Sequence, residues 1–335
     1  MTDERHRDSD EIPVITPARV DIIDTRDEGR DWYEREPVRS YPPAARRSLR
    51  WPIGLFVATC ISTFFTGMIP GGGAPDPTLF WNAPEALRTQ LIQNGAIFSG
   101  SLMLILFCHE MGHYLQAKRH GVHATFPYFI PMPFTPFGTM GAVIFQEPGV
   151  ADRRQMFDIA VSGPIAGLIV ALPIAFWGVQ QSVVAQFAPG RNAMSYGDPL
   201  ILKWMIAAKH GALAQNQDIL LNNNPLLFAG WVGIFITALN LLPVSQLDGG
   251  HILYTLLGPP ARRVAKLFML GALIYMMMTD NWAYFFMWFL VLMMGVSHPP
   301  TTNDRMQIGR LRTVVGWATL AFIIVGFTPM PLQFR

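Results

Sequence analysis

Three residues, His109, Glu110 and His113, bring metal-binding and acid–base groups together in one short stretch of the chain. Residues four positions apart lie on the same face of a helix, so the two imidazoles can bind one zinc ion. Glu110 then lies next to them, where it can act on the water that a catalytic zinc carries. The spacing therefore predicts a zinc site with its own general base.

This stretch lies inside a hydrophobic run, residues 96–117, that is long enough to cross a bilayer. An ionisable residue at membrane depth costs about 2.5–3.5 kcal/mol on insertion scales. Three such residues within five positions indicate a functional role that offsets this cost. Polar packing of buried histidines is the alternative interpretation of His109 and His113.

A third zinc ligand is predicted more than a hundred residues later. The hydrophobic run at residues 226–242 ends at Pro243, which has no N–H group and interrupts the helix. Asp248 follows, and the two glycines after it allow a tight backbone path. We predict that Asp248 completes a site for one zinc ion per chain, with the fourth position open as a catalytic zinc requires. A helix-end cap or an ion pair is the alternative for Asp248.

Asn240 precedes the break at Pro243 and is a candidate substrate-binding residue. Its side-chain amide could donate to an oxyanion or hold a substrate strand. Hydrogen bonding between helices is the alternative.

The composition is typical of a membrane protein rather than of a soluble domain. Of 335 residues, 51% are hydrophobic and 14% are charged, which predicts a lipid bilayer as the environment. The net charge of +2 gives no indication of a nucleic-acid partner. Both cysteines lie in apolar runs, which argues against a disulfide framework.

The hydrophobic runs predict an all-α polytopic membrane protein with about six to seven transmembrane helices. The runs are residues 51–69, 96–117, 156–177, 226–242, 267–279, 282–295 and 314–329. The runs at 267–279 and 282–295 are either two spans or one kinked helix. Seven spans would place the later basic clusters on the cytosolic side, which favours the pair. Short helices are expected outside the spans at residues 83–93 and 200–214.

Two regions differ in composition. Residues 1–47 contain no apolar run and carry charges of both signs, which predicts a disordered, charged cytosolic tail. Residues 48–335 are predicted to form one membrane-embedded domain, with a core at about 94–258. The segment between residues 178 and 224 is short for a separate peptide-binding domain, and none is predicted.

The segment from residue 120 to residue 154 predicts a re-entrant β-hairpin beside the helix that carries His109. Four prolines exclude a regular helix, and the aromatic residues are too apolar for water. Residues 138–145 read as a short strand, and irregular backbone at membrane depth must be surrounded by protein or a cavity. The free edge would bind an extended substrate by strand addition. The candidate substrate-binding residues there are Gly138, Gly141, Ala142 and Val143. An interfacial loop without a substrate role is the alternative.

These motifs resemble those of the site-2 protease family of intramembrane zinc metalloproteases. Residues 109–113 match its HExxH motif, residues 240–249 match NxxPxxxLDG, and residues 138–142 match the GTxGA stretch of one branch with a proline-rich segment. The similarity covers residues 98–251. It implies that His109, His113 and Asp248 bind zinc and that Glu110 is catalytic. It also implies hydrolysis of peptide bonds in or near transmembrane segments of substrate proteins. Many family members carry a PDZ domain, which this sequence lacks.

Two other functions use the same residues. A metal transporter typically shows internal repeats with paired broken helices, but the only break in this sequence is at Pro243 and no repeat is visible. A transport site also has no need for Glu110. A catalytically inactive scaffold would be favoured if Glu110 or a ligand were replaced, and all of them are present. The protease is therefore the predicted function.

The basic clusters predict that the N-terminus and the active-site side face the cytosol. Without an N-terminal signal or transit segment in the sequence, the expected location is a bacterial plasma (inner) membrane.

Overall fold

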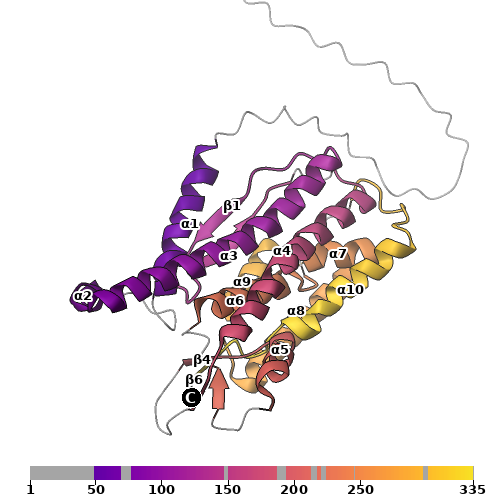
Figure 1. Cartoon of the computed structure of the whole chain (residues 1–335). Helices are drawn as coiled ribbons and strands as arrows, with labels where there is room; N and C mark the ends of the chain where they lie inside the picture. Colours follow the sequence, from indigo (N-terminus) through magenta and orange to yellow (C-terminus); the bar gives the residue numbers. More distant parts are fainter. Residues whose placement is uncertain are drawn as a thin grey trace, which may run out of the picture. The chain divides into compact units, whose positions relative to one another are not determined.

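The structure of the chain is a computed structural model. It describes residues 49–68, 77–146, 150–186, 194–212, 217–219, 224–244, 246–296 and 301–334. The described residues are mainly helical, with three small two-stranded sheets, which confirms the coarse fold class (Figure 1). The tail expected at residues 1–47 lies outside the described residues.

Three helices are long and apolar enough to cross a membrane: α1 (Arg50–Met68), α3 (Glu85–Arg119) and α4 (Arg153–Gln181). They correspond to the first three hydrophobic runs of the sequence. Helix α6 (Pro225–Asn240) follows the fourth run and is apolar but shorter. The expected total of six to seven spans is not confirmed, because among the described residues only these three helices meet both requirements.

The later hydrophobic runs form separate helices rather than one kinked helix. Helix α8 (Ala261–Thr279) ends before Asp280, whose left-handed backbone (φ 49°) separates it from α9 (Phe285–Met294). The ten residues of α9 rise about 15 Å, half the thickness of a hydrocarbon core. Thus α9 is too short to be a span. The last run forms α10 (Arg310–Gly326).

Helix α3 is longer than expected. The helix predicted at residues 83–93 and the span predicted at residues 96–117 form one continuous helix of 35 residues. Gly95 lies where the two predicted segments join, and a Cβ atom there would be 2.7 Å from the carbonyl oxygen of Phe64 on α1. The glycine therefore allows close contact between α1 and α3, and it does not interrupt α3.

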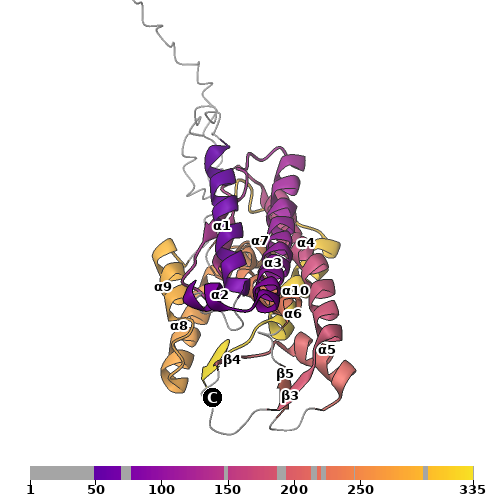
Figure 2. The ribbon, with the colours of Figure 1, turned by 60° about the vertical axis from the view of Figure 1, so that its left-hand side comes forward.

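Short elements connect the long helices. Helix α5 (Leu200–His210) lies within the expected helix at residues 200–214. The others were not foreseen: α2 (Pro77–Asn82), β3 (Val184–Gln186) paired with β5 (Gln217–Ile219), and β4 (Met194–Tyr196) paired with β6 (Leu332–Phe334). In Figure 2, α8 and α9 lie along one side of the bundle, and α5 lies on the other.

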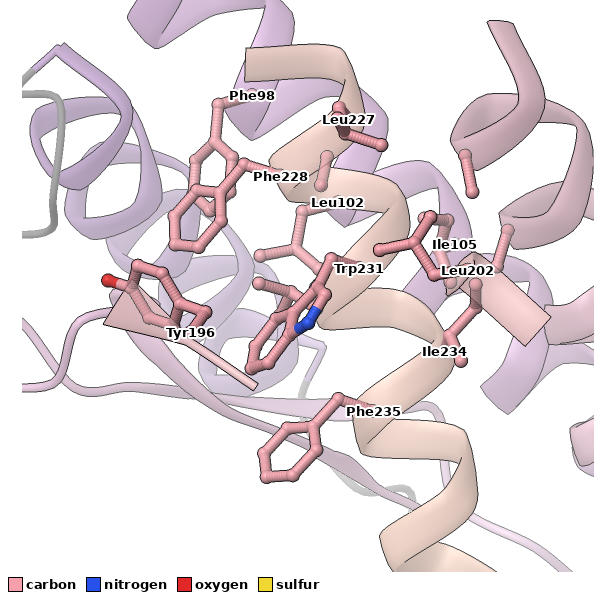
Figure 3. Packing of buried hydrophobic residues seen from close by; sticks show 14 of the residues in the cluster. Phe98, Leu102, Ile105, Tyr196, Leu202, Leu227, Phe228, Trp231, Ile234 and Phe235 are labelled. Atoms are coloured by element: carbon pink, nitrogen blue, oxygen red, sulfur yellow. The ribbon is translucent and has the colours of Figure 1, made fainter. Parts of the chain in front are cut away.

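The main core lies where α3, α4 and α6 pack together. Phe98, Leu102 and Ile105 of α3 are almost completely buried beside Phe228 and Trp231 of α6 (Figure 3). The rings of Phe98 and Phe228 stack with their centroids 5.0 Å apart. Within a bilayer, such close packing holds helices together because lipid tails are as apolar as the side chains.

The predicted hairpin is present as β1 (Tyr128–Pro131) and β2 (Thr139–Val143), which pair antiparallel with Phe129 opposite Ala142. It contacts α3 through β2, but its main support is α1. The rings of Phe56 and Phe129 meet edge to face at 5.1 Å, and the Ser62 hydroxyl donates to the Gly138 carbonyl at 2.6 Å. The hairpin is thus held chiefly by a helix outside the predicted catalytic core.

Candidate metal centre

Helix α3 carries two histidines and a glutamate of the site near its basic end. His109, Glu110 and His113 are 4%, 4% and 5% exposed, respectively. The two histidines lie one turn apart, and their ring centroids are 5.0 Å apart. Lys118 and Arg119 occupy the last turn of the helix, just beyond the site.

Asp248 reaches these histidines as the first residue of α7 (Asp248–Leu257). The chain turns sharply between α6 and α7, and a Cβ atom on Gly249 would lie 1.8 Å from the Leu241 carbonyl oxygen. Only glycine fits there, so the residue after Asp248 lets α7 begin directly against the end of α6. This close approach places the aspartate at the start of the helix.

The ligand atoms of the three residues converge. Asp248 Oδ2 lies 3.0 Å from His109 Nε2, and Asp248 Oδ1 lies 3.2 Å from His113 Nε2. The two Nε2 atoms are 3.2 Å apart. Ligands bonded to a tetrahedral zinc at typical lengths lie about 3.3 Å from one another. The three residues therefore present the spacing of a tetrahedral face.

Hydrogen bonding to His113 shows that this cluster suits a cation. His113 Nδ1 lies 2.7 Å from the carbonyl oxygen of Ile159, which can only accept, so Nδ1 carries the proton. Nε2 then faces the Asp248 carboxylate, and in the neutral ring it is the nitrogen whose lone pair can bind a metal ion. The Ile159 carbonyl fixes the ring that would bind it.

The donor set also fits a catalytic rather than a structural zinc. Two histidines and one carboxylate leave the fourth position open. Within the described part of the chain, no other group of three His, Cys, Asp or Glu residues has ligand atoms so close together. Cys108 adjoins His109 in sequence but is not part of the group.

Helix α4 provides space for both imidazoles. A Cβ atom on Gly163 would lie 2.0 Å from His113 Nε2, and one on Gly167 would lie 3.0 Å from His109 Nδ1. The two glycines are four residues apart, as are the two histidines. In the sequence, two glycines in an apolar run indicate only a small-residue face for helix packing. The matching four-residue spacing is the signal that could have linked them to the site, whereas nothing local marked the Ile159 carbonyl.

The predicted substrate-binding residues lie outside α3 and α7, the helices that carry the ligands. Asn240 is the last residue of α6 and is half-buried. Gly138 (φ 73°) lies against Thr63 and Thr66 of α1, and the atom nearest to a Cβ on Gly141 (φ 96°) belongs to Ile236 of α6. Their substrate role, with that of Ala142 and Val143 in β2, stays a prediction.

Known relatives share part of this chain. It is 32% identical to a probable zinc metalloprotease EGY1, chloroplastic, of Oryza sativa subsp. japonica, over 60% of this chain and 33% of the relative. The protein of the same name in Arabidopsis thaliana is 30% identical over 70% of this chain and 42% of its own length. The chain therefore spans well under half the length of these curated relatives. No solved structure matches it.

A family model matches more of the chain than its central motifs alone. Residues 97–279, which include His109, Glu110, His113 and Asp248, match peptidase family M50. The match begins within α3, includes α4, α6 and α7, and ends with α8. Because it covers more than half of the sequence, the chain belongs to peptidase family M50.

Proposed function

We propose that this chain is an intramembrane zinc metalloendopeptidase that hydrolyses peptide bonds in or near transmembrane segments of membrane proteins. The observation that carries the proposal is the convergence of two buried histidines and a half-buried aspartate on helices of a membrane-type bundle, with Glu110 next to one of them. Membership of family M50 and the names of the two relatives support it.

The residues have separate roles in this mechanism. His109, His113 and Asp248 hold the zinc ion, which when bound lowers the pKa of a water molecule toward 7 and polarises the scissile carbonyl. Glu110 takes a proton from the attacking water and passes it to the leaving amine. The Ile159 carbonyl keeps the His113 proton on Nδ1, so that Nε2 remains a ligand.

The hairpin is the part that would hold the substrate. A transmembrane helix hides its peptide bonds in its own hydrogen bonds, so it must unwind before it is cut. Strand β2 pairs with β1 on one edge, and among the described strands it has no other partner. Its second edge, from Gly138 to Val143, binds the unwound segment as an added strand. Asn240 steadies the same segment through its side-chain amide.

The orientation is proposed from the basic end of the bundle. The basic end is where α3 ends and where α4 and α10 begin. His120 of the α3 cap and Arg312 of α10 both pair there with Asp158 of α4. By the positive-inside rule this end, the metal centre and the N-terminus face the cytosol.

The two relatives are named as chloroplastic, so the comparisons give no support to a bacterial plasma membrane. Residues 48–335 form the peptidase domain.

Paired measurements on one variant test the proposal. The wild type and Glu110→Gln are reconstituted in liposomes with single-span substrates, and zinc content and cleavage are measured for both. We expect one zinc ion per chain in each protein and a loss of cleavage of at least about 10²-fold in the variant. Full cleavage by Glu110→Gln would contradict the assignment. Zinc binding without cleavage by either protein, together with passage of metal ions into the liposomes, would instead indicate a transporter.

A further inference from the structure

The short helix that carries Asp248 is fastened at its far end by one side chain. The last carbonyl groups of any helix have no partner within it. In α7, the Thr255 carbonyl accepts from Arg153 Nε at 2.6 Å, and the Leu256 carbonyl accepts from Arg153 Nη2 at 3.1 Å. The remaining nitrogen, Nη1, donates to the Asp304 carbonyl at 3.1 Å. All three nitrogens of this guanidinium are therefore bound to backbone.

The charge of Arg153 matches α7 better than it matches its own helix. Arg153 is the first residue of α4, where the helix dipole disfavours a positive charge. The C-terminus of α7, which this charge contacts, favours it. The position of the arginine is thus explained by the helix that it caps.

A second contact connects α7 to the segment that contains Asp304. The Tyr254 hydroxyl, on α7, donates to Asp304 Oδ2 at 2.7 Å. Asp304 Oδ1 in turn accepts from both the backbone N–H and the hydroxyl of Thr301. The segment that supplies one of the three carbonyls for Arg153 is therefore itself fixed to α7.

Helix α4 contacts the two histidine ligands and also the helix that carries the third ligand, Asp248. Its Ile159 carbonyl holds His113, and its glycines provide space for both imidazoles. Phe157 of α4 also packs in one buried cluster with Ile252 and Leu253 of α7. Arg153 also attaches the C-terminal end of α7 to α4. Asp248 lies at the other end of α7, seven residues or about 10.5 Å away.

We propose that Arg153 is a positioning residue for the metal centre. By capping α7 it fixes the direction of that helix on α4, and so it holds the Asp248 carboxylate against His109 and His113. The inference rests on the proposed function only in that these three residues bind zinc. The planar fork of arginine reaches three carbonyls from three separate nitrogens, whereas a lysine has its three donors on one nitrogen.

The chain offers a matched control in the next residue. Arg154 has the same charge and lies in the same first turn of α4, but it is exposed and its Nε donates to the Gln307 carbonyl at 2.7 Å. This hydrogen bond leads to the segment before α10 and not to α7. Replacing either arginine by glutamine removes the same charge, so a difference between the two variants reports on α7.

The test measures zinc affinity and cobalt spectra rather than cleavage. The full chain is purified in detergent as wild type, Arg153→Gln, Arg153→Lys and Arg154→Gln, and zinc binding is measured by competition with a chromophoric chelator. We expect Arg153→Gln to weaken zinc binding about tenfold. It should also change the visible spectrum of the cobalt-substituted protein, because the carboxylate ligand is displaced. Arg154→Gln should match the wild type, and Arg153→Lys should lie between.

Several outcomes would overturn the positioning role. Wild-type affinity and spectrum in Arg153→Gln would do so, as would equal weakening by Arg154→Gln, which would indicate a general charge effect. If Arg153→Gln does not fold, Arg153→Lys decides on the same two measurements, and a wild-type result there overturns the role. A wild-type chain that binds no zinc would instead refute the proposed function, and this inference with it.

Discussion

The metal centre and the hairpin are built in opposite ways. At the metal centre every ligand residue is fixed by close backbone contact: Gly163 and Gly167 against the imidazoles, and Gly249 against Leu241. The hairpin has an irregular register next to Pro131, and among the described residues Ser62 provides its side-chain hydrogen bond to α1. Apolar side chains on and after β2 remain exposed: Met140 at 38%, Val143 at 39% and Phe145 at 57%.

This difference suggests a division of work. A metal site loses affinity when its ligands shift by a fraction of an ångström, so rigid support is required. A surface that receives an unwound segment needs free backbone groups and exposed apolar side chains instead. Changes at the metal centre should therefore alter zinc binding and cleavage together, whereas changes at the hairpin should alter cleavage alone.

The largest effect is expected from Gly163→Ala. The added methyl group would lie 2.0 Å from His113 Nε2 and must displace the ring. We expect zinc affinity to fall about 100-fold, with loss of cleavage. Chelator competition measures this. Gly100→Ala on α3, where nothing lies within 4 Å of the new Cβ, is the control and should bind zinc normally. Normal zinc binding by Gly163→Ala would contradict the proposal that the site is rigid.

Ala142→Pro should affect the hairpin alone. Proline removes a backbone N–H from β2 and fixes φ, so an added strand can no longer pair there. Cleavage in liposomes should fall about tenfold or more while zinc content stays at the wild-type level. Ala142→Ser keeps the N–H and should cleave almost normally. Unchanged cleavage by the proline variant would show that the strand edge does not receive the substrate.

Ser62→Ala should loosen the hairpin from α1 with a smaller effect. It removes one of two donors to the buried Gly138 carbonyl, which still accepts from the Met132 N–H, and losing this hydrogen bond costs about 1 kcal/mol. Thermal unfolding should show this loss, and zinc affinity should not change. Thr59→Val is the control, because the Thr59 hydroxyl bonds to Leu55 within α1 rather than to the hairpin. Equal destabilisation by both variants would indicate that α1 itself, and not its contact with the hairpin, is affected.

The smallest effect concerns pH and the junction between Asp304 and α7. Burial alone would raise the pKa of the Asp304 carboxyl, but hydrogen bonds from Thr301 and Tyr254 and the charge of Arg153 together lower it below its usual range. Its contribution to stability is therefore complete above the unfolded pKa of about 3.9 and is lost as the pH falls through the lowered folded value. Asp304→Asn should unfold at a lower temperature than the wild type at pH 7, and the difference should shrink toward pH 3. A difference that is constant with pH would refute this.

The sequence predicted the parts of the site that depend on local spacing. The histidines of residues 109–113 and the break at Pro243 are each visible within a few residues of sequence. The structure brings the ligand atoms of His109, His113 and Asp248 within 4.8 Å of one another. The hairpin was predictable because prolines exclude a helix there. The glycines of α4 were interpreted only as packing residues, because their second role depends on which helix faces them.

Long-range contacts explain most of what the sequence did not reveal. The number of spans stays unconfirmed, because hydrophobic runs do not report helix length, as the ten residues of α9 show. Arg153 was interpreted only as a marker of membrane topology, since its bonds to α7 join residues about a hundred positions apart. The junction between the segments expected at residues 83–93 and 96–117 is instead a point of contact with α1, at Gly95.

The length of α3 has a consequence for where a substrate can be cut. Its 35 residues rise about 52 Å, and even a tilt of roughly 40° leaves it longer than a hydrocarbon core of about 30 Å. At least one end must therefore project into water, and Glu85 and Arg88 give the N-terminal end charges that favour water. His113 lies six residues before the other end, about 9 Å along the axis. Under the proposed function, the enzyme would select a peptide bond by its depth below one membrane surface.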